Sequence, residues 1–171
     1  NRGLGKALID LLIKDSDNFI ISISRNLNEI QKTYPKKNFH FIRADLSKKK
    51  LTKKLLILND LIRDQKIYFI NNAGVIKPIM RVQHFDEDII DKNISVNIKA
   101  PMLITAFLIS NFNHNKLVFT NISSGAASSP IANWSLYCSS KAFIKIFFEV
   151  TEKENSHYIF HNINPGVIDT K

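Results

Sequence analysis

The chain has 171 residues, of which 44% are hydrophobic and 23% charged, and these values exclude a disordered chain and favour one globular domain with a sizeable core. The formal charge is +9, but the densest lysine group, residues 48–54, is typical of a solvated helix face, so the charge alone does not indicate a nucleic-acid partner. Apolar runs fall short of the roughly 18 residues of a membrane span, and residues 1–5 lack the apolar core of a signal peptide. The single cysteine, Cys138, permits no internal disulfide. We therefore expect a cytoplasmic protein without membrane contact.

Hydrophobic periodicity predicts helices and strands that alternate along the chain. The predicted helices cover residues 4–14, 26–34, 50–65, 86–98, 100–111 and 135–153, and the predicted strands cover residues 18–24, 38–43, 66–70, 116–122 and 158–163. This alternation is typical of βαβ units, so the fold class is α/β, a doubly wound parallel sheet of Rossmann type in one domain over residues 1–171. A helix that opens with Gly3 and Gly5 normally follows a strand, and we therefore expect a partial domain, with more chain before and after it.

The first predicted helix begins with two glycines that flank Leu4. Backbone N–H groups at Gly3 and Gly5 can approach a pyrophosphate, and a helix N-terminus attracts negative charge. A structural turn is an equally good interpretation, because the first glycine of a G-x-x-x-G-x-G pattern is not in the sequence.

Tyr137 and Lys141 are four residues apart in the last predicted helix. Such a pair shares one helix face, about 6 Å apart along the axis. An ammonium nearby favours phenolate and lowers the pKa of a tyrosine, so the pair could exchange a proton with a carbonyl or alcohol. The same spacing also occurs by chance on helix surfaces.

Other polar and small residues follow the predicted strands. Ser124 follows one strand and precedes Tyr137 by 13 residues, and Asn71-Asn72-Ala73-Gly74 ends another. Carboxyl ends of parallel strands face the ligand crevice of a doubly wound sheet, so these segments could line one pocket. Asn97 lies in a predicted helix, where a solvated side chain would be the default.

In this order, these residues resemble the short-chain dehydrogenase/reductase family over nearly the whole chain. The segments that carry the resemblance are Arg2-Gly3-Leu4-Gly5, Asp45-Leu46, Asn71-Asn72-Ala73-Gly74, Val96-Asn97, Asn121-Ile122-Ser123-Ser124, Tyr137-Cys138-Ser139-Ser140-Lys141, and Pro165-Gly166 with Thr170. The resemblance implies that the cofactor is bound by Arg2, Gly3, Leu4, Gly5, Arg25, Asp45, Asn72, Ala73, Gly74, Tyr137, Lys141, Pro165, Gly166 and Thr170. It implies no metal.

The resemblance also implies a mechanism. Tyr137 would be the general acid in reduction, Lys141 would lower its pKa and hold the nicotinamide ribose, and Ser124 would orient the substrate oxygen. Asn97 would hold a water that links Lys141 to solvent. The family usually forms homodimers or homotetramers through two long helices, for which apolar residues at Leu103, Phe107, Phe143 and Phe147 would serve unless they belong to the core.

The end of the second strand of such a fold discriminates between the two nicotinamide cofactors. A carboxylate there binds the ribose of NAD, whereas an arginine accommodates the 2′-phosphate of NADP. Here the strand ends with Ser24-Arg25, and Arg2 could reach the same phosphate. Because a guanidinium suits phosphate, NADP(H) is favoured over NAD(H), although Arg25 could be a solvated loop residue.

The substrate is less well indicated. Trp134, Tyr137 and the stretch Asn97-Ile98-Lys99-Ala100-Pro101-Met102 resemble the sepiapterin and benzil reductase branch, which implies reduction of a compact dicarbonyl or ketone. Trp134 could wall an aromatic pocket or anchor the helix start. The alternatives are a 3-oxoacyl thioester reductase, an NAD(P)-binding relative without turnover, and a basic nucleic-acid-binding module.

Overall fold

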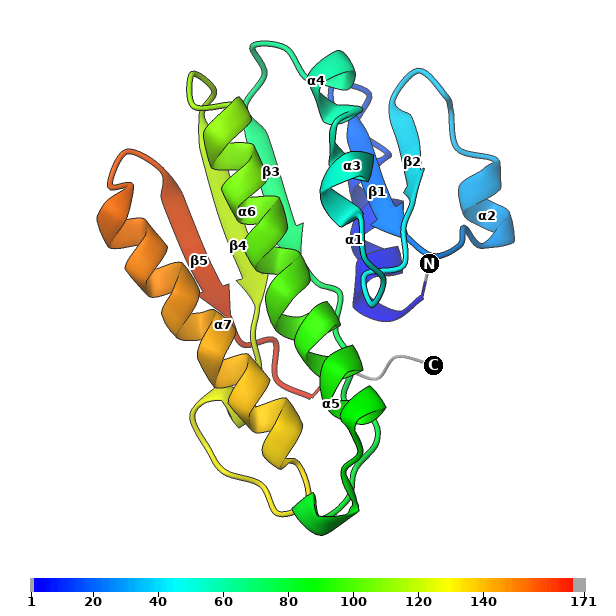
Figure 1. The fold of residues 1–171 in the computed structure, drawn as a ribbon. Coiled ribbons are helices and arrows are strands. Elements are labelled where there is room, and N and C mark those ends of the chain that lie inside the picture. The colour runs from blue at the N-terminus through cyan, green and yellow to red at the C-terminus, as the bar shows by residue number, and fades with distance from the viewer. Residues whose placement is uncertain (1, 168–171) are drawn as a thin grey trace. The chain divides into compact units, whose positions relative to one another are not determined.

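The structure is a computed structural model that describes residues 2–167. The chain divides into two compact units, whose described parts are residues 2–46 with Val167, and residues 47–166. In both units parallel strands are flanked by helices (Figure 1), which confirms the α/β, Rossmann-type class. The five strands form two sheets of two and three strands, each of which is described here within its own unit.

The first unit contains a two-stranded parallel sheet. Its elements are α1 (Gly3–Leu12), β1 (Ile20–Ser24), α2 (Glu29–Lys32) and β2 (Phe39–Arg43). Ile20 pairs with Phe39 and Ser24 with Arg43, so both strands end at the same level. The helix predicted over 26–34 is shorter because Asn28, in extended conformation, caps it through a reciprocal pair of hydrogen bonds with Gln31.

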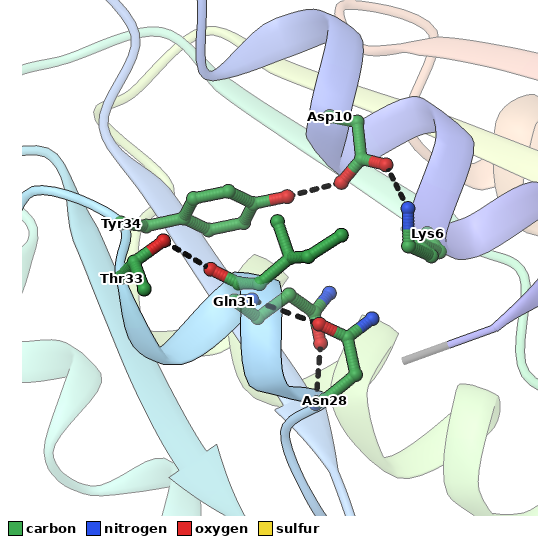
Figure 2. Close-up of polar contacts among 7 residues, drawn as sticks. Lys6, Asp10, Asn28, Gln31, Thr33 and Tyr34 are labelled. Atoms are coloured by element: carbon green, nitrogen blue, oxygen red, sulfur yellow. Dashed lines mark hydrogen bonds and ion pairs between the residues drawn. The ribbon is translucent and has the colours of Figure 1, made fainter.

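A polar cluster joins α1 to the segment that follows α2. Figure 2 shows the Asp10 carboxylate between two donors, the ammonium of Lys6 and the hydroxyl of Tyr34. The hydrogen bonds from Lys6 and then Tyr34 lower the pKa of Asp10 below its usual range. Two effects raise the pKa of Tyr34 to about 12: burial is the larger, and the hydrogen bond to Asp10 is the next.

The second unit is built on a three-stranded parallel sheet in the order β3-β4-β5. Its elements are α3 (Leu51–Leu55), α4 (Leu58–Leu61), β3 (Ile67–Asn71), η1 (Val82–His84), α5 (Glu87–Ile94), η2 (Ser95–Lys99), α6 (Ala100–Asn111), β4 (Leu117–Ile122), η3 (Gly125–Ala127), α7 (Ser135–Glu154) and β5 (Ile159–Ile163). In Figure 1 the long helices α6 and α7 cover one face of this sheet. The boundaries of all three strands agree with the sequence prediction to within one residue.

Aromatic side chains fill the space between this sheet and its helices. Phe69, Phe119 and Phe160 are register partners on the three strands, with ring centroids 6.1 and 4.6 Å apart. Phe148 of α7 packs edge-on against Phe160. Phe119 and Phe148 have no exposed surface, so this row is the centre of the core.

The helix predicted over residues 50–65 is not continuous. It breaks between α3 and α4, where Asn59 and Asp60 donate to the carbonyls of Leu56 and Ile57, three residues back, at 3.1 Å each. These tighter bonds replace α-helical ones, and Leu55 and Leu58 stay buried on both sides of the break. The apolar pattern predicts which face of this segment is buried, but it does not predict the change in hydrogen bonding that divides the helix.

The two helices predicted over 86–98 and 100–111 are one continuous helix with a π-helical turn, η2, in its middle. Pro101 has no N–H and cannot make the α-helical bond to the Asn97 carbonyl, and Ala100 donates to Ser95, five residues back. By length and composition this helix, Glu87–Asn111, could cross a membrane. It also buries Ile104 and Phe107, as a core helix of a soluble protein does.

Candidate active site

An asparagine ladder crosses the carboxyl end of the three-stranded sheet. Asn71, Asn121 and Asn162 are register partners on β3, β4 and β5. The Asn71 amide donates to Asn121 Oδ1 at 2.9 Å, and the Asn121 amide donates to Asn162 Oδ1 at 2.8 Å. Asn121 has no exposed surface. The ladder therefore holds the three strands in register near their carboxyl ends, next to the segments that the sequence assigns to the site.

Lys141 of α7 is buried, with 6% of its surface exposed. Its Nζ donates to the carbonyl oxygen of Ile122 at 2.7 Å and lies 5.8 Å from the centroid of the Tyr137 ring. Burial lowers the pKa of Lys141 to about 8. The predicted pairing of Lys141 with Tyr137 on one helix face is thus present, with a cation whose proton is weakly held.

Asn97 lies in the π-helical turn, and its side chain is buried and fully engaged. Its Oδ1 accepts from the Val75 N–H at 2.8 Å, and its Nδ2 donates to the Val75 carbonyl at 2.8 Å and to Ser140 Oγ at 3.1 Å. The side chain therefore fixes the segment after Gly74. Pro101, which has no N–H, leaves the Asn97 backbone carbonyl without its α-helical donor.

Gly74 lies against two of the predicted catalytic residues. A Cβ at this glycine would come within 3.5 Å of Asn97 Oδ1 and 3.9 Å of Lys141 Nζ. Both atoms therefore lie around one point of the backbone, although Asn97 and Lys141 are 44 residues apart in the sequence. Both distances are those of ordinary van der Waals contacts, so the Gly74 backbone lies directly beside these two side chains.

Ser124 lies two residues after the end of β4 and is the N-cap of η3. Its Oγ accepts from the Ala126 N–H at 3.2 Å, and η3 packs against α7. Tyr137 is half-buried, and the Trp134 ring stands edge-on to it at 5.8 Å. The serine segment and the tyrosine helix therefore belong to one packed region.

The segment after β5 also reaches this region. A Cβ at Gly125 would lie 3.7 Å from Asn164 Nδ2, and the Gly166 N–H donates to Asn164 Oδ1 at 3.1 Å. Gly166 has φ +71°, which favours glycine. Pro165 is half-buried beside it, and Thr170 lies outside the described residues.

Of the remaining cofactor residues predicted from the sequence, Asn72 and Ala73 directly follow β3 in the second unit, and the others belong to the first unit. Gly3 begins α1 with φ +54°, and exposed Arg2 precedes it without a side-chain cap. Backbone N–H groups in the first turn, including those of Leu4 and Gly5, can therefore face a phosphate. The other two residues, Arg25 after β1 and Asp45 after β2, are exposed.

Sequence reasoning missed three contributors to this geometry. Ser140 is buried and donates to the Tyr137 carbonyl at 2.9 Å while accepting from Asn97. Ile122 and Val75 act only through their backbones, for which side-chain patterns give no signal. Ser140 could have been noticed as a small polar residue directly before Lys141, three residues after Tyr137. Within residues 2–167 no three side chains of the metal-binding types cluster together.

The whole chain, residues 1–171, matches the family model described as short chain dehydrogenase. The protein is a short-chain dehydrogenase/reductase. It is 30% identical to a benzil reductase ((S)-benzoin forming) of Bacillus cereus over 99% of this chain and 73% of the relative. It is 35% identical to the sepiapterin reductase of Xenopus tropicalis over 62% of this chain and 42% of that protein.

Among solved structures, 4-hydroxyisoleucine dehydrogenase complexed with NADH is similar, with a TM-score of 0.87 and 25% identity over 99% of this chain and 71% of that one. The family and branch assigned from the sequence are confirmed. The protein is an oxidoreductase of a family that uses a nicotinamide cofactor.

Proposed function

We propose that this short-chain dehydrogenase/reductase is an NADPH-dependent carbonyl reductase in which Tyr137 gives the proton to a ketone or dicarbonyl. The observation that carries the proposal is the buried ammonium of Lys141, held 5.8 Å from the Tyr137 ring centroid by its bond to Ile122. In a site of low dielectric a fixed cation stabilises phenolate strongly. This arrangement supports Tyr137 as the proton donor.

The residues divide the chemistry among them. The bound nicotinamide would supply the hydride. The Tyr137 hydroxyl would donate its proton to the carbonyl oxygen as that oxygen becomes an alcohol. Ser124 Oγ would orient the same oxygen, and the Lys141 ammonium would stabilise the tyrosinate and bind the ribose hydroxyls.

The Lys141 ammonium also suits proton resupply. Its pKa of about 8 lies close to working pH, so it can exchange its proton. The Asn97 carbonyl would hold the water that carries this proton inwards from solvent. The Asn97 side chain has the separate task of fixing the Val75 segment.

The preference for NADPH rests on charge in the first unit. The strand β1 ends at Ser24, and exposed Arg25 follows in place of a carboxylate. Arg2, also exposed, precedes the turn at Gly3. Two guanidinium groups suit a 2′-phosphate better than a 2′-hydroxyl.

The substrate class rests on the relatives named for benzil and sepiapterin and on the aromatic pair Trp134 and Tyr137. A compact dicarbonyl that carries an aromatic group is consistent with the named relatives and with the aromatic pair. A 3-oxoacyl thioester is the competing substrate, because the same proton donor would serve it.

The proposal includes a cytoplasmic homodimer or homotetramer that contacts neither nucleic acid nor membrane. Phe143 of α7 is 47% exposed and Phe147 and Leu103 are half-buried, so these residues can contribute to a contact between copies. Phe107 is buried in the core and does not form part of such a surface.

The test is NADPH oxidation by the full-length gene product with benzil, sepiapterin, small diketones and a 3-oxoacyl thioester. We expect turnover of the dicarbonyls, and about 10²-fold or greater loss of kcat in Tyr137→Phe, with NADPH binding retained. Faster turnover of the thioester would favour the competing function. An unchanged rate in Tyr137→Phe would refute the assigned proton donor.

A further inference from the structure

Two loops of the second unit are joined beside the catalytic tyrosine. One follows Val75 and the other follows η3 and leads into α7. The Met80 N–H donates to the carbonyl oxygen of Asn133 at 3.1 Å. This bond joins the two loops at Asn133, one residue before Trp134. The Trp134 ring contacts Tyr137.

Asn133 has an unusual backbone conformation. Its φ is +66°, in the left-handed region, and among the described residues other than glycine only Lys50 shares a positive φ. The Trp134 N–H donates to the Ile131 carbonyl at 3.1 Å, so Asn133 occupies the third position of a tight turn. Asparagine tolerates this conformation, whereas β-branched residues oppose it.

Large apolar side chains lie exposed on both loops. Ile79, next to Met80, is 49% exposed, and Ile131, two residues before Asn133, is 41% exposed. Trp134 is half-buried at the start of α7. Apolar groups that gather in the open next to a reactive group commonly mark a binding surface for an apolar ligand.

We propose that Asn133 is a specificity-determining residue: its left-handed turn and its bond to Met80 make the two loops one apolar wall that receives the aromatic group of the substrate. This inference rests on the proposed carbonyl reductase function and adds the substrate class, an aryl ketone or aryl dicarbonyl. The backbone of Asn133, rather than its exposed side chain, does the positioning.

The first experiment measures binding without turnover. Trp134 is the only tryptophan of the 171 residues, so the difference in intrinsic tryptophan fluorescence between the wild type and Trp134→Phe reports this wall. Benzil is titrated into the NADP⁺-bound protein, with N-acetyltryptophanamide as the correction for absorbed light. We expect saturable quenching in the wild type and in Asn133→Gly, which adopts the left-handed turn without strain, and weaker affinity in Asn133→Val.

The second experiment compares kcat/KM for benzil and for 2,3-butanedione, which has no aryl group. In Asn133→Val the ratio of the two values should fall about tenfold or more, the factor expected for a strained backbone position, mainly through KM for benzil. Asn133→Gly should keep the wild-type ratio. Thermal unfolding and NADPH affinity show whether each variant is folded.

The outcomes separate the two proposals. Saturable quenching without NADPH oxidation would refute the proposed function and leave the wall standing. Turnover of both diketones with an unchanged ratio in folded Asn133→Val would overturn the role of Asn133. If Asn133→Val does not fold, Ile131→Ser is the second variant, because it changes the wall but not the turn. It must lower the ratio of kcat/KM for benzil to kcat/KM for 2,3-butanedione, and an unchanged ratio overturns the inference. Absence of quenching in the wild type would also overturn it.

Discussion

The ammonium of Lys141 and the carbonyl oxygen of Ile122 lie 2.7 Å apart, so the last residue of β4 holds the cation that serves Tyr137. Ile122 directly follows Asn121, the buried centre of the asparagine ladder. The position of a charge on a helix is therefore set by side-chain hydrogen bonds across a sheet.

The pH dependence of reduction should reflect Lys141. Because burial lowers its pKa to about 8, the ammonium loses its charge as the pH rises through that value, and kcat/KM should fall there. An arginine keeps its charge over the whole range, so in Lys141→Arg the fall near pH 8 should vanish, whatever the absolute rate. A wild-type profile that stays flat from pH 7 to about 10 would contradict this role.

The same group should affect stability with a definite sign. The pKa of Lys141 is about 8 in the folded chain against 10.5 for the ordinary value, so between these values the unfolded chain binds more protons. The free energy of unfolding from this group therefore rises with pH between about 8 and 10.5 and is flat below that window. Urea unfolding of wild type and Lys141→Met isolates this contribution, since the other titrating groups are common to both. The unfolding free energy of the wild type minus that of Lys141→Met should rise with pH across this window, and a fall would be the wrong sign for Lys141.

Interrupting the asparagine ladder should destabilise the second unit. Asn121→Leu leaves the buried Asn71 amide without its acceptor, and an unsatisfied buried group costs about 1–3 kcal/mol. Asn162 is exposed, so water can replace the bond that its side chain loses. We expect a loss in this range by urea unfolding, together with lower kcat. Asn113→Leu is the control, because that side chain is exposed before β4. Equal losses of unfolding free energy in the two variants would show that the asparagine ladder does not stabilise this unit.

In the first unit, Tyr34→Phe removes the hydrogen bond to Asp10. The expected loss in unfolding free energy is about 0.5–1 kcal/mol, because the pair is partly screened by solvent. The pKa of Tyr34 is raised to about 12, so this stabilisation is complete below pH 10 and declines between about 10 and 12. Tyr68→Phe, at an exposed position, should show no such decline.

Arg25 should control the choice of cofactor. Arg25→Asp replaces a cation with a carboxylate after β1, which repels a 2′-phosphate and can bind a ribose hydroxyl. We expect kcat/KM for NADPH to fall about tenfold to a hundredfold while that for NADH holds or rises. Steady-state kinetics with both cofactors measure it, and an unaltered preference would make Arg25 a solvated loop residue.

The sequence by itself determined the order of helices and strands, the pairing of Tyr137 with Lys141 on one helix face, and the family. These features depend on local periodicity and on residue type, both of which are readable in one dimension. The tertiary structure decided which atoms make the contacts of the site. The Ile122 carbonyl binds Lys141, and the backbone of Val75 binds Asn97. The Asn121 side chain joins two neighbouring strands, and the Asn133 carbonyl binds Met80 from a left-handed turn. Backbone groups are identical at every position, so only the folded chain selects which of them lies next to a buried charge or amide.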